Sequence, residues 1–423
     1  MAVLVDIGAH PDAVAKLLAK SPVASKLRTA EWERLPVAIR ERSQFSAGVE
    51  NMRVLTTIQS KLVDRVNLAK EQLGNGKEAF VDRSSFIGDL RKITKEEGLG
   101  DGSGGLTDIR SRQRLGLIYD MQTQMAAGFA RHKSNQDPDV LDAYPAQELI
   151  REEDRMVPRD WSSRWAAAGG QLYGGRMIAL KSDPVWSAIS RFGTPWPPFD
   201  FGSGMGIEDI DRDEAEALGL IAKDEEAKPI ETDFNDRLEA STEEVPETMR
   251  QEFKQMYGDK VSVAGNSVAW VGDQGVEIGK LWDKAVAGQV KPFESYELGP
   301  VGDTARKLIT EVRPQWDLTK VQDAVSNKDF RHPFDRHGGD NEKDPNQIGL
   351  DREDALRIPL VLDSPDQAFP GRWPSTVALV RKFMDGTQVY VEVMQDGKKQ
   401  KGKPKLMTKT MWKMKPGVAP RMA

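Results

Sequence analysis

The spacing of apolar residues changes between the beginning and the end of the chain, and this change limits the possible folds. Between residues 52 and 73, apolar side chains recur every three or four residues, which is the period of an amphipathic helix. Between residues 376 and 414, three runs rich in β-branched and aromatic residues follow one another, and Asp385-Gly386 separates the first two as a hairpin turn would. The sequence therefore predicts an α+β, multidomain protein with a mainly helical N-terminal part and a small C-terminal α+β domain that ends in an antiparallel meander.

Charge and composition predict where the parts divide. From Glu208 to Lys254 the chain has 17 acidic and 6 basic residues, and the stretch 223–258 has few apolar side chains. Such a composition favours a linker over a packed element. The expected organisation is a helical region at 1–136, a compact region at 137–222, an acidic linker at 223–258, an α+β domain at 259–415 and a tail at 416–423.

Three local patterns in the first half predict particular elements. Thr107 and Asp108 are expected to cap a helix that runs through RSRQRLGLIYDMQTQMAAGFARH. The prolines at 195, 197 and 198 exclude a continuous helix there, and the surrounding aromatic residues predict an aperiodic segment held by ring packing. A short helix, Arg212–Leu218, should follow and end at Gly219.

Composition also excludes several classes of protein. The chain has no cysteine, so it has no disulfides, thiolate metal ligands or cysteine nucleophiles, which fits a reducing cytosol. It has no run of about 18 apolar residues, so we expect no membrane partner. The first residues lack the basic and apolar regions of a signal peptide. We expect no cofactor.

The C-terminal end is basic. From Gly371 onward there are 12 basic and 3 acidic residues, which would suit an anionic partner such as RNA. A solvated strand edge protected by lysines is the alternative that charge alone leaves open.

Two of the four histidines of the chain lie in the segment DFRHPFDRHGGD, at positions 332 and 337, each directly after an arginine. Their spacing does not match a helical zinc motif, and a metal site would have to borrow Asp335, Asp340 or Asp344, so we predict no metal. A merely structural pair of solvated histidines is one alternative. The other is acid/base catalysis, because the pKa of histidine lies near neutrality.

The first half of the chain resembles a phage protein family. The pieces RLGLIYDMQTQMAAGFA, PRDWSSRWAAAGG and SDPVWSAISRFGTPWPPFDFGSGMGIEDIDRDEAEALGL follow one another as they do in head-morphogenesis proteins related to the F protein of phage Mu. Many relatives carry a histidine and cysteine pair near the final motif, which this chain lacks. The resemblance covers residues 30–222 and implies a non-enzymatic minor capsid protein near the portal. Portal and capsid proteins would be its partners, and it would occupy the virion and, during assembly, the cytoplasm of the bacterial host.

The C-terminal part resembles a second phage family. The histidine-bearing segment is followed by LDREDALRIPLVLDSPDQ, VALVRKF, QVYVEVM and LMTKTMWKMK, an order similar to that of phage-borne nucleases grouped with barnase, EndoU, the colicin RNases and RelE. The resemblance spans residues 261–415 and implies a metal-independent endoribonuclease, and thus a toxin or effector domain, with a small antiparallel sheet.

The candidate site residues follow from this second resemblance and from the strand period. His337, which precedes Gly338-Gly339, is the principal acid/base, and Thr408 and Thr410 should share one face of the last strand by the period of two. The predicted catalytic set is His337, Arg381, Thr410, Thr408 and His332. The predicted phosphate- or nucleic-acid-binding set is Arg331, Arg336, Lys382, Lys409 and Lys413, with Lys409 and Lys413 on the face opposite the threonines.

Two alternatives for the C-terminal domain stay open. One is an inactive domain in a purely structural virion protein. The other is an effector that resembles ADP-ribosyltransferases, for which Glu392 is the one available catalytic glutamate in the predicted hairpin.

Overall fold

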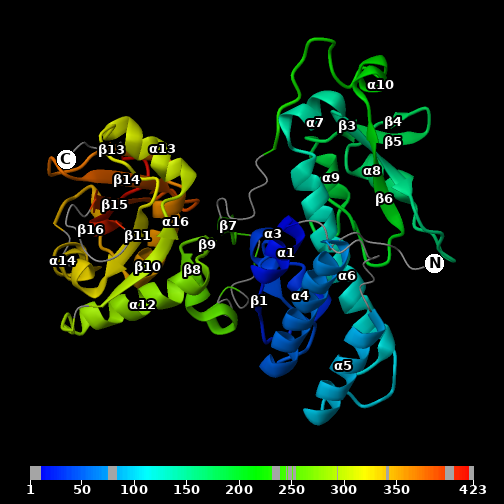
Figure 1. Cartoon of the computed structure of the whole chain (residues 1–423), viewed down its shortest axis with the longest axis horizontal. Helices are drawn as coiled ribbons and strands as arrows, with labels where there is room; N and C mark the ends of the chain where they lie inside the picture. Colours follow the sequence, from blue (N-terminus) through cyan, green and yellow to red (C-terminus); the bar gives the residue numbers. More distant parts are fainter. Residues whose placement is uncertain are drawn as a thin grey trace. The chain divides into compact units, whose positions relative to one another are not determined.

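The computed structural model describes residues 11–74, 83–230, 239–243, 245, 250, 254–292, 294–339, 343–395 and 404–418, without the side chains of residue 11 and residues 65–74. The chain forms two compact units (Figure 1). One comprises Met1–Glu33 and Arg40–Phe234, and the other comprises Arg34–Ile39 and Asn235–Ala423. Each contains helices and strands, as the predicted α+β, multidomain class requires.

The N-terminal unit combines a helical body with a small sheet. Its elements are α1 (Pro11–Leu18), β1 (Ser21–Pro22), α2 (Thr29–Trp32), β2 (Ser43–Gln44), α4 (Met52–Gly74), α5 (Arg83–Glu96), α6 (Arg112–Ser134), α7 (Pro138–Ala143), β3 (Ala146–Arg151), α8 (Trp161–Ala167), β4 (Leu172–Tyr173), β5 (Arg176–Leu180), α9 (Val185–Ile189), β6 (Met205–Ile210) and α10 (Arg212–Ala217). The division assigns residues 37–39 of the short helix α3 (Val37–Arg40) to the second unit and Arg40 to the first.

The long helices follow the predicted apolar stripes. In α4, Leu55, Ile58 and Leu62 are buried and pack in one core with α5 and α6. The predicted start of α6 is wrong. The helix is capped by Ser111, whose side chain accepts a hydrogen bond from the Arg114 N–H at 3.0 Å, because the carboxylate of Asp108 is already used within the preceding loop, where it accepts from the Gly104 and Arg110 N–H groups.

The segment with many prolines is ordered by its aromatic rings, as predicted. Trp186 and Phe199 are fully buried, and Trp186 also packs edge-on against Trp165 with ring centroids 5.1 Å apart. This region also contains a four-stranded sheet in the order β4-β5-β3-β6, which the sequence analysis did not predict. The signal for its hairpin was Gly174-Gly175, both at positive φ between two short apolar runs.

The C-terminal unit contains two sheets. Its elements are β7 (Glu239–Ser241), η1 (Gly258–Lys260), β8 (Val261–Ala264), β9 (Ser267–Trp270), α12 (Gly272–Val286), β10 (Ser295–Pro300), α13 (Asp303–Val312), β11 (Gln322–Ser326), α14 (Asn327–His337), β12 (Gln347–Ile348), α15 (Arg352–Leu356), α16 (Ile358–Asp363), β13 (Gln367–Pro370), β14 (Val377–Lys382), β15 (Gln388–Gln395) and β16 (Lys405–Met414).

The larger sheet contains the predicted meander. Strands β14, β15 and β16 are antiparallel neighbours, and Gly386 in the turn between β14 and β15 has φ of 81°. The sheet is wider than predicted: its order is β10-β11-β16-β15-β14-β13, and β12 also pairs with β16. Strand β11 runs parallel to β16. One face packs on the helices through a large apolar core that includes Leu379, Val391 and Met411.

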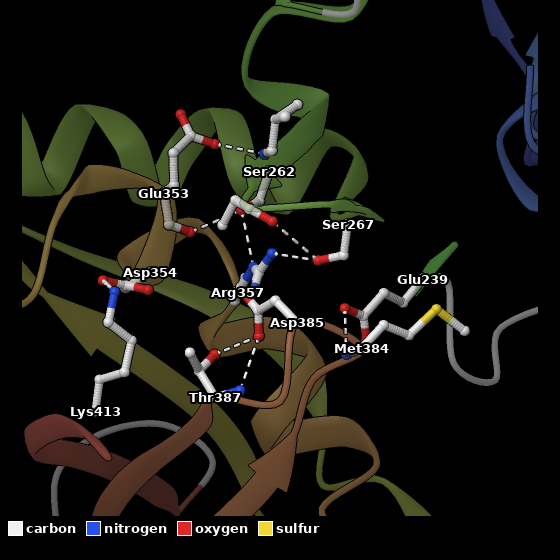
Figure 2. A network of polar contacts seen from close by, with 12 residues as sticks. Glu239, Ser262, Ser267, Glu353, Asp354, Arg357, Met384, Asp385, Thr387 and Lys413 are labelled. Carbon is white, nitrogen blue, oxygen red and sulfur yellow. Dashed lines mark hydrogen bonds and ion pairs between the residues drawn. The ribbon is translucent and has the colours of Figure 1, made fainter. Parts of the chain in front are cut away.

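The smaller sheet, β7-β9-β8, is joined to the larger one through Arg357, whose side chain is 0% exposed. Its Nε donates to Ser262 Oγ at 3.0 Å, and its Nη2 donates to Ser267 Oγ, also at 3.0 Å (Figure 2). Its Nη1 lies 3.4 Å from Asp385 Oδ2 in the β14–β15 turn, and its guanidinium lies over the Phe383 ring. A single buried cation therefore binds both sheets.

The partners of Arg357 are themselves held in place. Ser262 Oγ donates to the Glu353 carbonyl at 2.9 Å, and the Val263 N–H donates to the Glu353 carboxylate. The Asp385 carboxylate accepts from the N–H and the hydroxyl of Thr387 at 2.9 and 2.6 Å (Figure 2). The network thus fixes the helix α15, the strand β8 and the turn together.

The predicted acidic linker contains one of these strands. Within 223–258 the structure describes Glu239–Ser241 as β7, which pairs with β9, and the Glu239 carboxylate accepts from the Met384 N–H at 2.8 Å. Residues 231–238 of the predicted linker lie outside the described residues, as does the segment 396–403 between the second and third predicted strands. No helix of the described part of the chain has both the length and the apolarity to cross a membrane.

The Arg357 network predicts where the C-terminal folding unit begins. A fragment 235–423 keeps Ser262 and Ser267, whereas a fragment 306–423 leaves the guanidinium in the interior without them. Each hydrogen bond that a buried charged group loses costs about 1.5–3 kcal/mol, and 306–423 also loses the apolar residues of β9 and α12. We expect cooperative thermal unfolding for 235–423 and none for 306–423, measured by circular dichroism. Equal stability of the two fragments would contradict this account.

Candidate active site

Both histidines of the segment 329–340 lie on α14. The helix begins after Ser326, whose side chain accepts from the Asp329 N–H at 3.3 Å, and Phe330 anchors it in the core. His332 is exposed, and His337 is the last residue of the helix. Their ring centroids are 6.2 Å apart and nearly perpendicular, so the two imidazoles form a pair at the surface of the unit.

Two arginines, Arg336 and Arg372, lie close enough to His332 to act on its pKa. Although His332 is exposed, partial desolvation of its ring is the largest cause that lowers its pKa, and His337, Arg336 and Arg372 lower this pKa further. Asp335 acts in the opposite direction with a smaller effect. The surroundings of His332 therefore favour its neutral form. Arg372, which belongs to the loop between β13 and β14, is far from α14 in the sequence but close enough to act on its histidine.

Strand β16, which packs beside α14, contains a β-bulge that changes which of its side chains face the core. Glu392 of β15 pairs with Thr410 of β16, but the next residue, Val393, pairs with Thr408, which leaves Lys409 as an extra residue. Paired residues of antiparallel strands have side chains on the same face. Thr408 therefore lies with Val393 on the core face, and Thr410 lies with Glu392 on the opposite face. We call the opposite face the Glu392 face; it carries Thr376, Ala378, Val380, Tyr390, Glu392, Thr410 and Trp412.

Glu392 holds the loop 371–376 on this face. Its Oε1 accepts from the Arg372 N–H at 2.7 Å and from the Thr376 hydroxyl. Glu392 is only 1% exposed, and a Cβ at Gly371 would come within 2.4 Å of this carboxylate oxygen, so the loop requires glycine there. The glutamate thus fixes the backbone from which the Arg372 side chain extends. The Thr410 hydroxyl, on the residue paired with Glu392, is buried and has no hydrogen-bond partner among the described residues.

Three predicted site residues face the core. The Arg381 guanidinium is buried and donates to the carbonyls of Leu360 and Ser364 at 3.1 and 3.3 Å, at the end of α16. The prediction that Thr408 and Thr410 share a face is wrong because of the bulge. Lys413 also points to the core face, where its Nζ donates to Asp354 at 2.6 Å. Burial raises the pKa of Asp354 to about 6, and Lys413 opposes that change.

The other predicted cations differ in their exposure and in the ion pairs and hydrogen bonds they make. Arg331 forms an ion pair with Asp335 at 2.9 Å and donates to the Ala285 carbonyl, so it is used within the helical layer. Lys382 is exposed at the end of β14, and Lys409 in the bulge is close enough to Asp329 to act on that residue's pKa. Arg336 is exposed beside His332. The structure therefore brings together His332, His337 and Arg336 from the predicted set. Their catalytic and binding roles stay a prediction.

Sequence reasoning missed Arg372 and the loop that carries it. One signal was present: Glu392 is the single charged residue in the strand QVYVEVMQ, and an acid between buried β-branched residues requires a polar partner. From the sequence, the one role proposed for Glu392 is that of a transferase glutamate. Its burial and its bonds to the loop are the properties of a residue that positions others.

A second buried acid lies on the core face. Asp323 of β11 is 4% exposed, and its Oδ1 has no hydrogen-bond partner among the described residues. Burial raises the pKa of Asp323 to about 8, and Asp363 adds to that increase. Asp323 pairs with Leu406, which belongs to the apolar core, so it lies on the face of the sheet opposite Glu392.

Comparison with known proteins bears on the C-terminal unit. Residues 306–419 match a protein-family model described as a phage-Barnase-EndoU-ColicinE5/D-RelE like nuclease. The C-terminal domain is nuclease-like. The match covers α14, the loop 371–376 and the β14–β16 meander, and it leaves out β7, β8, β9 and α12. No curated protein matches the chain, and no solved structure matches it. Among the described residues there is no group of three or more potential metal-ligating side chains.

Proposed function

We propose that the C-terminal unit is a ribonuclease and that the histidine pair of α14 performs its acid/base chemistry. The observation that carries this proposal is the nuclease family match, which covers both histidines and Arg372. The imidazole pair, the cations beside it and the basic end of the chain are the groups that phosphodiester cleavage would use. RNA is the proposed substrate because its 2′-OH supplies an internal nucleophile.

In the proposed reaction the 2′-oxygen attacks the adjacent phosphorus and the bond from phosphorus to the 5′-oxygen breaks. One imidazole accepts the proton of the 2′-OH, and the other, as imidazolium, gives a proton to the leaving 5′-oxygen. The products are a 2′,3′-cyclic phosphate and a 5′-hydroxyl end. His332 suits the base because its lowered pKa keeps it neutral. This leaves His337, the predicted principal acid/base, as the proton donor.

Arg336 and Arg372 would hold the phosphate. Both act electrostatically on His332, so a phosphate close to the imidazole pair would also be close to both guanidiniums. Arginine holds phosphate oxygens with two parallel hydrogen bonds, which fixes orientation as well as charge. Glu392 would position Arg372 through its backbone without touching the substrate. The step uses no metal ion.

For the N-terminal unit we propose the role that its resemblance implies, a minor head protein bound near the portal. What supports this is the order of the segments between residues 30 and 222. In the unit itself, perturbed groups such as Lys16 and His132 are buried against rings and ion pairs, as structural groups are. Portal and capsid proteins remain its proposed partners, and the virion, with the host cytoplasm during assembly, its proposed location.

His337→Ala is expected to reduce RNA cleavage by about 10²–10⁴-fold, because a proton donor is lost. The assay uses the full chain, labelled RNA and EDTA, and it identifies cyclic-phosphate ends. Lys328→Ala, at an exposed position of the same helix, is the matched control and should cleave as the parent does. Equal cleavage by His337→Ala would refute its role. Silence of the parent on RNA together with protein labelling from NAD would favour a transferase, and silence in both assays an inactive domain.

The pH profile tests His332 separately. As the base it must be neutral, so kcat/KM should be retained above its pKa and lost as pH falls through that value, which lies below the usual 6.5. Arg336→Ala and Arg372→Ala each remove a charge that lowers this pKa, so the acid limb should move to higher pH in both variants. An acid limb that stays in place in both variants and in His332→Ala would exclude His332 as the base.

The head-protein proposal predicts that the protein copurifies with assembled phage particles. Mass spectrometry of particles from a density gradient should detect peptides of the N-terminal unit at low copy number relative to the major capsid protein. Peptides found only in the soluble fraction of the lysate would contradict a virion role. This result does not depend on whether the C-terminal unit cleaves RNA.

A further inference from the structure

An exposed tryptophan lies next to Arg372 in the loop held by Glu392. Trp373 is 48% exposed, although a large aromatic ring is normally buried. In the described part of the C-terminal unit, the other exposed large apolar side chains are Val286 and Met384. Val286 ends α12, and Met384 belongs to the β14–β15 turn, so neither shares the loop with Arg372.

The backbone of Trp373 is fixed on both sides. Its N–H donates to Thr376 Oγ1 at 3.2 Å, and its carbonyl accepts from the Thr376 N–H at 3.0 Å. Pro374 occupies the second position of this turn, where its restricted φ favours the bend. The same Thr376 hydroxyl donates to Glu392. The ring is therefore presented from a rigid turn, so binding on it would cost little loop ordering.

Charge accompanies the ring. The guanidinium of Arg372 lies 5.6 Å from the Trp373 ring centroid, and its charge acts on His332. Aromatic rings and arginine planes are the surfaces on which proteins stack nucleobases that are not paired. A nucleotide whose phosphate binds Arg372 would have its base within reach of this surface.

We propose that Trp373 and Arg372 form a nucleobase-stacking subsite and that the enzyme takes RNA whose base beside the cleaved bond is unpaired. This inference rests on the proposed ribonuclease function and adds its substrate class. In a duplex each base is already stacked and paired, so it could reach Trp373 only after it is extruded. Stacking does not depend on hydrogen bonds to the base edge, so the subsite selects single strands without strong sequence preference.

The test compares Trp373→Ala, Trp373→Phe and the control Met384→Ala in the full chain. The binding probe is a fluorescein-labelled single-stranded RNA with 2′-O-methyl riboses, which cannot be cleaved, and its fully paired form. One stacked base is worth about 1–3 kcal/mol, so Trp373→Ala should weaken single-strand binding about 5- to 150-fold. Trp373→Phe should retain most of the affinity because it keeps a ring, and Met384→Ala should bind as the parent does. Circular dichroism of each variant shows whether it is folded.

The outcomes separate the two levels of the proposal. If Trp373→Ala and Trp373→Phe bind and cleave single-stranded RNA as the parent does, the subsite is wrong and the ribonuclease stands. Equal cleavage of paired and unpaired RNA by the parent would also overturn the subsite. If the parent neither binds nor cleaves RNA, the ribonuclease itself fails. If Trp373→Ala does not fold, Trp373→Phe becomes the test. A folded Trp373→Phe that loses as much affinity as expected for the alanine variant would contradict stacking, because it still has an aromatic ring.

Discussion

The buried guanidinium of Arg357 is the interaction on which the C-terminal unit depends. A charge withdrawn from water loses several kcal/mol of hydration, which only a nearly complete set of partners can offset. Here the partners come from the small sheet, through Ser262 and Ser267, and from the β14–β15 turn, through Asp385. Since the serines precede residue 306, the stretch that matches the nuclease family is shorter than the compact unit that contains it. Residue 306 is therefore where the sequence similarity begins, and the compact unit begins earlier in the chain.

The polar groups on the two faces of the large sheet have different roles. On the core face, the polar groups bond to other groups inside the unit: Arg381 binds the end of α16, and Lys413 binds Asp354. On the Glu392 face, the buried carboxylate holds a loop whose side chains reach outward. The bulge at Lys409 makes this division possible, because it turns Thr410 away from the core while Thr408 remains in it. A regular strand would have placed both threonines on one side.

Period and turn chemistry were sufficient to predict the elements that depend on local sequence. The helix α4, the hairpin β14–β15, the strand β16 and the aromatic packing around Trp186 all follow from patterns within one segment. The parallel pairing of β11 with β16 joins segments about eighty residues apart, and no local pattern encodes it. The bulge could not be predicted for a similar reason, because register depends on both strands. It places Thr408 and Thr410 on opposite faces, where a regular strand would have placed them on one.

The candidate site shows the same limit at the level of single residues. The histidine pair was visible because histidine is rare in this chain and both residues lie on one helix. Arg372 was not visible, because its role depends on a loop that Glu392 holds from a neighbouring strand. A sequence reveals which groups can do chemistry more readily than which of them the backbone brings together.

The cations around His332 have opposite effects before and after a substrate binds. In the free protein desolvation, and after it His337, Arg336 and Arg372, disfavour the imidazolium, so the surroundings favour the form that accepts a proton. A phosphodiester bound by Arg336 and Arg372 would offset their charge, and the imidazolium that forms on proton abstraction would then face less repulsion. Under the proposed function, the groups that bind the phosphate would therefore also raise the basicity of His332 when the 2′-OH arrives. Substrate binding and base strength would be coupled through the same two guanidiniums, which is why the position of the acid limb in their variants is more informative than their activity alone.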